Sequence, residues 1–443
     1  MSIRNVSQKE PRTVVRGSPS GLIERKLEIG NFLIRMKMCN FVSFMGKYAQ
    51  DRKQFNMSNK KGRVSTPTFI DLFAGSGGLS LGLEQAGFQS IFFNEIEPVF
   101  ASTYMANRKI KKGHYYVGDI NKLNDELSKF KHIWESIDGG VDLVCGGPPC
   151  QGFSSANRQR VIDDPRNGLY KAYLKFLSAV RPKVFIMENV KGMAQRIDEI
   201  KDNFKEYLGE DYLFEARILK AQDFGVPQNR ERLIFIGNRL GINPADIFTA
   251  INAYRRAPFM LGDALRGLPH LEARKVKNAS DIEEIETGLT ERQFEYEKND
   301  FYRFINGNRD ISILYNHKNR YNNERDIEIY RRLPQGANSL HESIQDIMPY
   351  KRRLGIFKDK YFKLDEHQIC KTITSHMKYD CNMYIHPWEA RGLSPREAAR
   401  VQTFPDDYVF LGAQNGWYAQ IGNAVPVKLA EAIGKGILDT VKL

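Results

Sequence analysis

The sequence has few cysteines and no long apolar run, and each absence excludes a class of protein. Its 443 residues include five cysteines, none in a Cys-x-x-Cys pair: Cys39, Cys145, Cys150, Cys370 and Cys381. So odd and sparse a set indicates neither a disulfide framework nor a zinc site, and we expect no metal. No run is long enough to span a bilayer, and the N-terminus lacks a signal peptide's apolar core. We therefore expect a cytoplasmic protein of two or three domains, without a membrane partner.

Positive charge is in excess, but most of it lies at one end. The formal net charge is +13, and residues 1–66 hold 14 lysines and arginines against 4 acids, which is +10 of that total. A basic protein favours a polyanionic partner, although a basic tail is usually only solvated. The extension also embeds an apolar, partly helical segment from Leu22 to Tyr48. It is a flexible arm, an accessory DNA-binding helix pair, or sequence upstream of a start at Met57; we favour a dispensable arm.

Regular α/β organisation begins after this extension. The pattern predicts a strand over Thr68–Phe73, a glycine turn over Ala74–Gly78 and an amphipathic helix over Leu79–Ala86. Glycines in such a turn let a ligand approach the backbone amides at the start of the helix. Since many nucleotide-binding folds share this turn, it is a weak signal by itself.

Two further predicted strands end in carboxylates. Ile91–Glu95 brings Glu95 to a strand end about 20 residues after the glycine turn, where an acid can accept hydrogen bonds from ribose hydroxyls. Tyr115–Ile120 contains Asp119, which suits an adenine amino group. This spacing predicts an adenosine-containing cofactor, without distinguishing NAD from S-adenosylmethionine.

A stiff loop follows the buried parallel strand predicted at residues 141–144. It reads Cys145-Gly-Gly-Pro-Pro-Cys150-Gln-Gly-Phe-Ser154, and its two prolines remove backbone donors and fix the turn. A thiol held there acts as a nucleophile if its surroundings favour the thiolate. From the loop alone, a small buried cysteine is an equally good interpretation of Cys150.

Charged side chains lie in or directly before two later predicted strands. Tyr170–Val180 is predicted as a helix, and the buried strand Val184–Val190 carries Glu188 toward its tip, as a salt-bridge member or a general acid. Arg230 and Arg232 precede a strand at residues 233–237. Two arginines two residues apart are expected to point the same way and to share one anion or base edge.

The α/β rhythm is lost between about residues 238 and 386, where aromatics, Asn-rich turns and mixed charges predict a separate irregular domain. Regular structure returns at Ser394, Pro395 and Glu397, which together form the signature of a capped helix start. The chain closes with a Gln420–Val427 segment and a helix predicted over Lys428–Val441.

In this order, the motifs resemble those of the DNA cytosine-C5 methyltransferases of bacteria, from residue 69 to the C-terminus. Six motifs carry the resemblance: Asp71-Leu-Phe-Ala-Gly-Ser-Gly-Gly78, Gly147-Pro-Pro-Cys-Gln-Gly-Phe-Ser154, Glu188-Asn-Val190, Gln228-Asn-Arg-Glu-Arg232, Leu393-Ser-Pro-Arg-Glu-Ala-Ala-Arg400 and Gln420-Ile-Gly-Asn-Ala-Val-Pro426. Any one of them is weak, whereas six in sequence order are specific.

The resemblance implies a fold, a reaction and site residues. It implies a Rossmann-like α/β domain that binds S-adenosylmethionine, with a smaller irregular target-recognition domain. Cys150 would attack C6 of cytosine, Glu188 would bind the N3 edge, Arg232 would hold O2, and Arg230 and Gln151 would support them. The implied cofactor-binding residues are Phe73, Ala74, Gly75, Ser76, Gly77, Gly78, Glu95, Ile96, Asp119, Ile120, Pro148, Asn423 and Val425. The implied DNA-binding residues, on a loop that closes over a flipped base, are Ser154, Ser155, Arg158 and Arg160.

The same resemblance implies a domain division and partners. Residues 67–240 would form the catalytic domain, 241–385 the target-recognition domain, and 386–443 a return that completes the catalytic domain; residues 1–66 fall outside the match. We expect a monomer that methylates a short double-stranded DNA sequence, with a cognate restriction endonuclease encoded nearby. The recognised sequence does not follow from any side-chain code.

Two other functions remain open from the sequence. The RNA-acting branch of the family methylates a tRNA cytosine, but typically carries a Cys-Phe-Thr tripeptide, whereas Cys370 and Cys381 are followed by Lys and Asn. A non-catalytic binding protein would usually lack Cys150 or Glu188, and both are present. The basic extension would add operator binding if it formed a helix pair.

Overall fold

The structure, a computed structural model, describes residues 66–149, 168–277, 286, 288–349 and 360–443. The chain separates into two units, Met1–Arg63 and Val64–Leu443, and every described residue belongs to the second. Cys150 and the expected loop residues Gln151, Ser154, Ser155, Arg158 and Arg160 lie outside the described residues. In the ranges described, no helix is long and apolar enough to cross a membrane.

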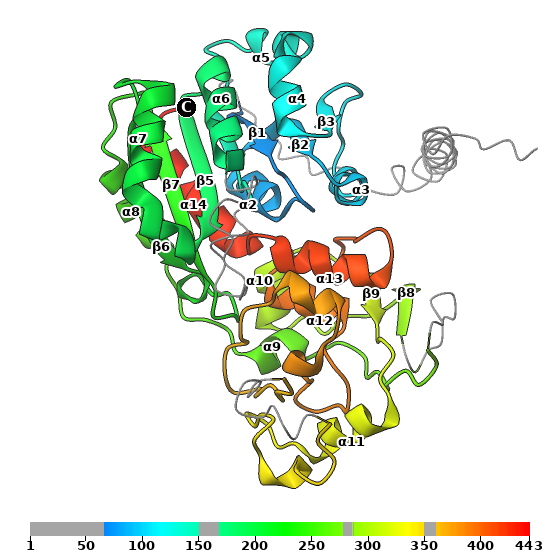
Figure 1. Cartoon of the computed structure of the whole chain (residues 1–443). Coiled ribbons are helices and arrows are strands. Elements are labelled where there is room, and N and C mark those ends of the chain that lie inside the picture. The colour runs from blue at the N-terminus through cyan, green and yellow to red at the C-terminus, as the bar shows by residue number, and fades with distance from the viewer. Residues whose placement is uncertain (1–65, 150–167, 278–285, 287, 350–359) are drawn as a thin grey trace, which may run out of the picture. The chain divides into compact units, whose positions relative to one another are not determined.

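Seven strands of the described chain form one sheet, in the order β3-β2-β1-β4-β5-β7-β6 (Figure 1). Their bounds are β1 Thr68–Leu72, β2 Gln89–Glu95, β3 Tyr115–Val117, β4 Leu143–Gly146, β5 Val184–Val190, β6 Leu213–Lys220 and β7 Glu231–Asn238. The strand β7 runs antiparallel to β5 and β6, and the other pairs are parallel. The strand order reverses between β1 and β4, and open α/β sheets bind ligands at the carboxyl ends beside such a point.

Helices cover both faces of the sheet because its central strands are apolar on both sides. They are α2 Gly78–Ala86, α3 Pro98–Ala106, α4 Ile120–Asp125, α5 Lys131–Glu135, α6 Leu169–Val180, α7 Ile197–Leu208, α8 Pro244–Asn252 and α14 Val427–Thr440. One core cluster joins the sheet to α5, α6 and α7 through Trp134, Phe176 and Phe204. The cluster on the opposite face joins it to α2 and α14, with Leu83 and Ile433 among its members.

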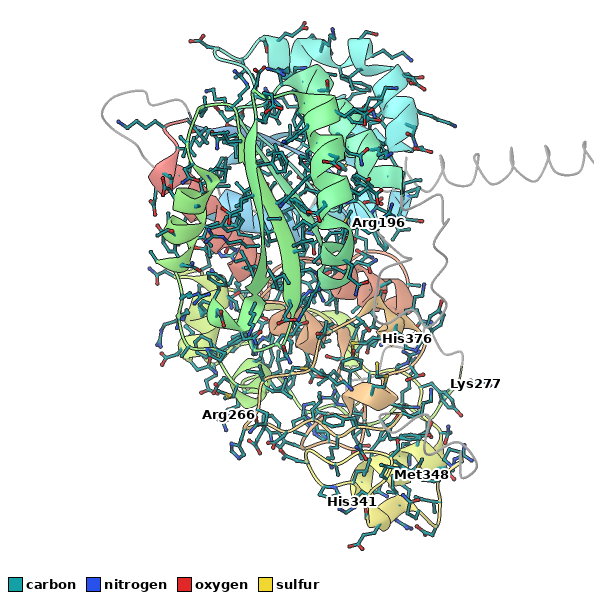
Figure 2. The ribbon with its side chains drawn as sticks, turned by 60° about the vertical axis from the view of Figure 1, so that its left-hand side comes forward. Arg196, Arg266, Lys277, His341, Met348 and His376 are labelled. Atoms are coloured by element: carbon teal, nitrogen blue, oxygen red, sulfur yellow. The ribbon has the colours of Figure 1, made fainter. Side chains whose placement is uncertain are left out.

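The remaining elements lie beyond the end of the sheet, where Figure 2 shows Arg266, His341 and Met348. They are α9 Leu261–Leu265, β8 Gly288–Gln293, α10 Asp300–Asn306, β9 Ile313–Lys318, α11 Glu324–Arg332, α12 Pro395–Val401 and α13 Gln414–Asn423, with short 3₁₀ turns between them. The strands β8 and β9 pair antiparallel. Helices α9 and α10 share one core cluster with α12 and α13, so chain segments from both sides of residue 386 build it.

Most of the predicted elements are confirmed. The strand at Val184–Val190 has the expected bounds, and α6 matches the helix predicted from Tyr170 to Val180. The capping box is present, with the Ser394 hydroxyl accepting from the Glu397 amide and the Glu397 carboxylate accepting from the Ser394 amide. The prediction of a strand through Ile120 is wrong, because β3 ends at Val117 and a helix begins at Ile120.

Candidate active site

The glycine turn between β1 and α2 has an unusual backbone. Phe73, Gly75 and Gly77 all have positive φ, at 56°, 56° and 86°. The conformation costs little at glycine but strains Phe73, so its surroundings must fix it. The Ala74 amide donates to the Asn94 carbonyl at 2.9 Å, which ties the turn to β2. A Cβ on Gly75 would meet no atom within 4 Å, so the backbone there faces open space that a ligand can enter.

Glu95, at the end of β2, is bound to the same turn. Its Oε2 accepts from the Gly75 amide at 2.7 Å, and its Oε1 accepts from the Glu97 amide at 2.8 Å. Burial raises the pKa of this carboxyl, although the two amides lower it. The next side chain, Ile96, is 59% exposed, so an apolar surface lies beside the carboxylate at the carboxyl end of the sheet.

Asp119 caps helix α4, and its Oδ1 accepts from the Asn121 amide at 2.8 Å. Ile120, the first residue of that helix, is buried. The carboxylate keeps further lone pairs on the exposed side of this cap, where a donor such as an exocyclic amine can approach.

The end of the chain packs against the glycine turn. The Ser76 hydroxyl donates to the Gln420 carbonyl at 3.3 Å, and a Cβ on Gly78 would lie only 2.6 Å from the Val425 carbonyl oxygen. Val425 is buried and Asn423 is exposed. The motif that begins at Gln420 is therefore brought to the first βα turn, more than 300 residues away in sequence.

The loop after β4 brings the described residues Gly147 and Pro148 against Glu188. A Cβ on Gly147 would lie 2.9 Å from Glu188 Oε2, so a side chain at this position would displace the Glu188 carboxylate. The Pro148 carbonyl accepts from the Asn189 side-chain amide at 3.0 Å. These contacts fix the start of the loop, directly before Cys150, against the tip of β5.

Glu188 also pairs with Arg232, since its Oε1 lies 2.6 Å from the arginine Nε. Both side chains are 13% exposed, which leaves part of each accessible. The Arg232 Nη1 donates to the Glu231 carbonyl at 2.8 Å. A carboxyl group and a guanidinium held side by side present an acceptor and donors to one edge of a planar polar ligand.

Arg230 does not share a contact with Arg232, contrary to the sequence-based expectation. It lies directly before β7 and is only 1% exposed. Its guanidinium donates to the carbonyls of Ile373, Gly422 and Ala424 at 2.7, 3.1 and 2.9 Å. Burial, with the neighbouring charge of Arg232, lowers the pKa of Arg230 well below its usual value. These bonds tie the Gln228–Arg232 motif to the end of the chain.

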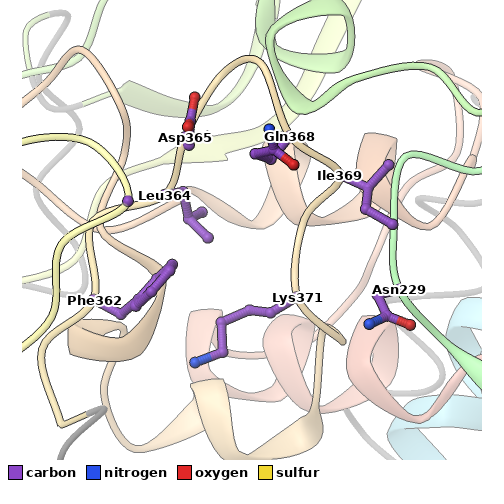
Figure 3. Close-up of a pocket in the computed structure, with 8 residues that line it drawn as sticks. Asn229, Phe362, Leu364, Asp365, Gln368, Ile369 and Lys371 are labelled. Atoms are coloured by element: carbon purple, nitrogen blue, oxygen red, sulfur yellow. The ribbon is translucent and has the colours of Figure 1, made fainter.

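A pocket of about 350 Å³ opens beside this motif (Figure 3). Apolar and polar residues line it, and in sequence one of them precedes β7 while the others follow it. The lining residues are Asn229, Gly336, Phe362, Leu364, Asp365, Gln368, Ile369 and Lys371. The Lys371 ammonium lies 4.8 Å from the centre of the Phe362 ring. The pocket is thus separate from the glycine turn and adjoins the residue that precedes Arg230.

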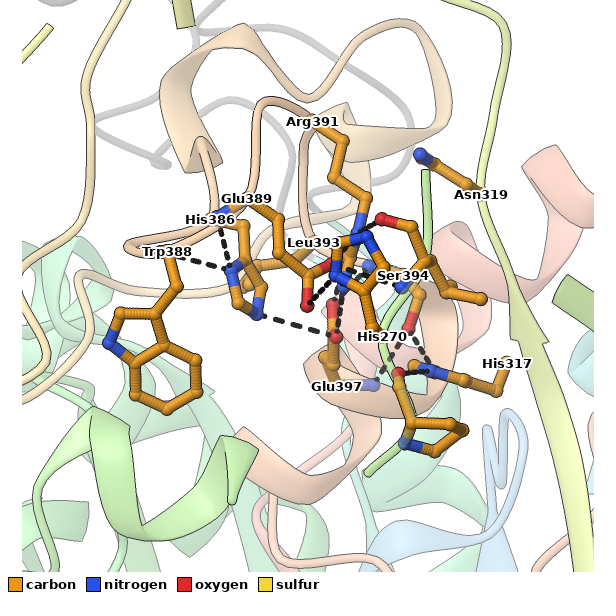
Figure 4. Close-up of polar contacts among 12 residues, drawn as sticks. His270, His317, Asn319, His386, Trp388, Glu389, Arg391, Leu393, Ser394 and Glu397 are labelled. Carbon is orange, nitrogen blue, oxygen red and sulfur yellow. Dashed lines mark hydrogen bonds and ion pairs between the residues drawn. The ribbon is translucent and has the colours of Figure 1, made fainter. Parts of the chain in front are cut away.

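A buried polar network holds the start of α12 (Figure 4). Arg391 is fully buried and donates through both terminal nitrogens to Glu397, at 2.8 and 2.7 Å. His317, from β9, lies 2.9 Å from both the Ser394 hydroxyl and the Pro269 carbonyl. Since the Pro269 carbonyl can only accept, the His317 Nε2 must donate, and its Nδ1 accepts from Ser394. The network joins residues 269–271 and β9 to α12.

Sequence reasoning missed a buried carboxyl beneath the glycine turn. Asp71 accepts from the Ser80 hydroxyl at 2.5 Å, and Ser80 also contacts the Tyr104 hydroxyl at 2.8 Å. Burial raises the pKa of Asp71 to about 7, although Ser80 and the charge of Arg108 lower it. Asp71 begins the first of the six motifs, but an acid inside an otherwise apolar strand does not identify its partners. Among the described residues, no group of three or more His, Cys, Asp or Glu has a metal-binding arrangement.

Comparisons with known proteins identify the relatives of this chain. The family described as C-5 cytosine-specific DNA methylase matches residues 67–439. The chain is 33% identical over 385 residues to Type II methyltransferase M1.HphI of Haemophilus parahaemolyticus, covering 84% of this chain and 86% of that protein. It is 34% identical over 383 residues to Type II methyltransferase M.PspPI of Psychrobacter sp. (strain TA137), covering 84% and 79%.

A solved structure has a similar fold. It is the crystal structure of a DNA modification methyltransferase encoded within a prophage, from E. coli. The two structures superpose with a TM-score of 0.66 at 28% sequence identity, over 85% of this chain and 99% of that one.

Proposed function

This chain belongs to the family of C-5 cytosine-specific DNA methylases and is a DNA (cytosine-5-)-methyltransferase, and from that premise we propose that it transfers a methyl group from S-adenosylmethionine to C5 of a flipped cytosine in a short double-stranded DNA sequence. One observation carries the proposal at residue level. The Glu188–Arg232 pair lies at the carboxyl end of β5, against Gly147 and directly beside the segment that leads to Cys150.

The cofactor would lie across the glycine turn. The open space at Gly75, the exposed apolar side chain of Ile96 and the carboxylate of Glu95 fit an adenosine: a ribose whose hydroxyls donate to Glu95 and a base packed on Ile96. Asp119 would accept from the adenine amino group. When bound, S-adenosylmethionine supplies an electrophilic methyl group. The turn residues from Phe73 to Gly78, with Ile120, Pro148, Asn423 and Val425, complete the proposed site.

The reaction needs help because C5 of cytosine is a poor nucleophile. We assign Cys150 as the thiolate that adds to C6, which converts the ring into an enamine and raises the electron density at C5. Glu188 would deliver a proton to N3 as the thiolate adds, so that no charge accumulates on the ring. Arg232 would donate to O2 and hold the base against both groups. The enamine C5 would then take the methyl group. Loss of the C5 proton to a base, departure of the Cys150 thiolate from C6 and return of the N3 proton to Glu188 would restore the aromatic ring and the free enzyme.

Arg230 would act as a positioning residue. Its guanidinium is committed to three backbone carbonyls, which hold Arg232 and the end of the chain in register. Gln151 would support the nucleophile from the loop beside it.

A cytosine inside a duplex cannot present C6 to a thiol, so the base must be flipped, at a cost of a few kcal/mol. We propose that Ser154, Ser155, Arg158 and Arg160 contact the DNA as their loop closes over the flipped base. The arginines would reach phosphates, which makes binding dependent on salt. Residues 241–385 would read the major groove, while residues 67–240 and 386–443 would form the catalytic domain and residues 1–66 a dispensable extension.

The biological setting follows from the relatives, which are Type II methyltransferases. We propose that this protein protects host DNA in a restriction-modification system, acts as a monomer in the cytoplasm, and has a cognate endonuclease encoded nearby.

Methyl transfer from labelled S-adenosylmethionine to duplex DNA tests the proposal, with Cys150→Ala beside the wild type and bisulfite sequencing of the product. Methylcytosine in one short motif, absent with the variant, would establish the reaction and its specificity together. Transfer to tRNA and to no DNA would place the protein in the RNA-acting branch. No transfer to either would leave a binding protein.

A further inference from the structure

The carbonyl side of the glycine turn is held by two side chains that lie outside every motif described above. The Arg108 Nη2 donates to the Gly77 carbonyl at 2.8 Å, and the Tyr408 hydroxyl donates to the Ser76 carbonyl. The two side chains also contact each other, because Arg108 Nη1 donates to the Tyr408 oxygen at 2.9 Å. Two successive carbonyls of the turn are therefore bound by one arginine–tyrosine pair.

Arg108 is itself fixed from two helices. It follows α3, its side chain is 5% exposed, and its Nε lies 2.9 Å from Glu84 Oε1 on α2. Its guanidinium carbon lies 4.1 Å from the centre of the Tyr104 ring. Burial lowers the pKa of Arg108, but the Glu84 carboxylate and the neighbouring tyrosines raise it well above its usual value, so the group stays charged. A buried charge that is paired and hydrogen-bonded on every side has little freedom to move.

Tyr408 lies in a segment, residues 405–411, that is hydrogen-bonded on two sides. Asn107, beside Arg108, exchanges two bonds with the backbone of Val409, at 2.8 and 3.0 Å. Asn316 of β9 exchanges two bonds with the backbone of Phe410, both at 2.9 Å. The segment thus spans from the end of α3 to β9, and Tyr408 projects from it to the glycine turn.

We infer that Arg108 and Tyr408 are positioning residues for the cofactor. They hold the turn from Phe73 to Gly77 in the conformation that has positive φ at Phe73, Gly75 and Gly77, and so set the affinity for S-adenosylmethionine. The inference rests on the proposed function of this turn. Neither side chain needs to touch the cofactor, since both act through the Gly77 and Ser76 carbonyls. A strained residue such as Phe73 keeps its conformation only where the surroundings over-determine it. Tyr408→Phe removes the side-chain donor to the Ser76 carbonyl, and loss of Arg108 leaves the Gly77 carbonyl with the Leu81 amide alone, so the turn loses the contacts that oppose its relaxation.

The test uses the full chain and three variants, Tyr408→Phe, Arg108→Lys and Arg108→Met. Two control variants lie away from the glycine turn, at Tyr212 directly before β6 and at Arg181 directly after α6. Tyr212→Phe removes a buried hydroxyl that donates to the Pro182 carbonyl at 2.5 Å. Arg181→Met removes an arginine that pairs with Asp211 at 2.5 Å and lies 5.5 Å from the Tyr212 ring centre. The Kd for S-adenosylhomocysteine is measured by calorimetry, the Kd for duplex DNA by fluorescence anisotropy, and the KM for S-adenosylmethionine and kcat by methyl transfer.

We expect Tyr408→Phe to raise the Kd for S-adenosylhomocysteine by about 2- to 12-fold, since one net hydrogen bond is lost. Arg108→Met should raise it further, and Arg108→Lys should recover part of the loss because an ammonium can still donate to the Gly77 carbonyl. The KM for S-adenosylmethionine should rise with this Kd, while kcat and the Kd for DNA change little. The two control variants should bind S-adenosylhomocysteine as the wild type does.

An unchanged Kd for S-adenosylhomocysteine in Tyr408→Phe would overturn the inference. So would an equal loss of affinity for DNA and for S-adenosylhomocysteine together with a lower unfolding temperature, because that result assigns only a general structural role. If the wild type itself failed to bind S-adenosylhomocysteine, the proposed cofactor site would be wrong, and the inference would fail with it.

Discussion

The Glu188 carboxylate and the Arg232 guanidinium lie 2.6 Å apart, Oε1 to Nε, across the antiparallel strands β5 and β7. Glu188 is opposite Ile234, and Val190 is opposite Arg232, so the two charged residues are diagonal neighbours on one face of the sheet. The strand register therefore places both groups, and a mobile loop is not required to bring them together. A pair positioned in this way should act as a unit on the base.

The first prediction concerns that unit. Glu188→Gln should lower kcat for methyl transfer by about 100- to 10,000-fold, the usual contribution of a general acid. Arg232→Met should lower it as well, since the base and Glu188 both lose a donor. The double variant should lie within a few-fold of the more damaged single variant, because residues that act as a unit are strongly non-additive. Single-turnover methyl transfer with duplex DNA measures all three.

Glu231→Gln is the matched control for this cycle. Glu231 is the next residue to Arg232 and pairs with Lys191 at 2.7 Å on the surface. Its removal should leave kcat within about twofold, since an exposed pair contributes little. If the fold-losses in kcat of the two single variants multiply in the double variant, Glu188 and Arg232 have independent roles, which contradicts the proposed unit.

The sequence predicted elements whose local signals agree with their tertiary surroundings. The strand at Val184–Val190 is an apolar run that ends in Glu-Asn, and its burial on both faces of the sheet is what that pattern requires. The helix start at Ser394 was predictable because a capping box is a local hydrogen-bond pattern. The position of Glu95 at the end of β2 was predictable because an apolar run that ends in an acid is a local strand pattern.

Contacts between distant segments could not be predicted in the same way. Arg230 and Arg232 are two residues apart, yet Arg230 is committed to the carbonyls of Ile373 and Gly422, which lie more than 140 residues away in sequence. Likewise, nothing local in the sequence shows that Tyr408 reaches Ser76, across more than 300 residues. Helix α8 packs in the core cluster of the sheet, where Ile251 lies against Gly436 of α14, and its own sequence does not identify that distant partner.

The second prediction tests the packing of α2 on α14, which supports the glycine turn. A Cβ on Gly82 would lie 2.4 Å from the Ala430 Cβ and 2.5 Å from the Val427 carbonyl oxygen. Gly82→Ala should therefore lower the free energy of unfolding by about 1–3 kcal/mol, the usual cost of overpacking. Gly416→Ala, in helix α13, is the control, since its Cβ would meet no atom within 4 Å. Chemical denaturation should show that this second change is neutral or stabilises by up to about 1 kcal/mol, and equal losses in both would contradict the steric argument.

The third prediction concerns the buried Asp71. Burial raises its pKa to about 7 from an ordinary value of 3.8, so the carboxyl stays protonated in the folded protein at a pH where it ionises in the unfolded chain. Its contribution to stability is present below about pH 4 and is lost as the pH rises to about 7. Relative to Asp71→Asn, the wild type should lose about 1.4 kcal/mol per pH unit across this window. Denaturation profiles of the two proteins at several pH values measure the difference.

Ser80→Ala is a second test of the pH window of Asp71. The Ser80 hydroxyl donates to the carboxylate at 2.5 Å and lowers its pKa. Its removal should extend the window to higher pH. A constant difference in stability between wild type and Asp71→Asn at every pH would show that the carboxyl does not titrate as described.

The fourth prediction has the opposite sign and concerns His317, in the network that joins β9 to α12. Burial lowers the pKa of His317 to about 4 from 6.5, and the Glu397 carboxylate offsets only part of this effect. The charge of Arg391 lowers the pKa further, and a protonated ring would also lose its bond from Ser394. The unfolded chain thus takes up a proton first as the pH falls. Relative to His317→Gln, the wild type should lose about 3 kcal/mol of stability between pH 6.5 and pH 4. Above pH 7.5 the two profiles should run parallel, which is the internal control, and parallel profiles down to pH 4 would contradict the burial of a neutral ring.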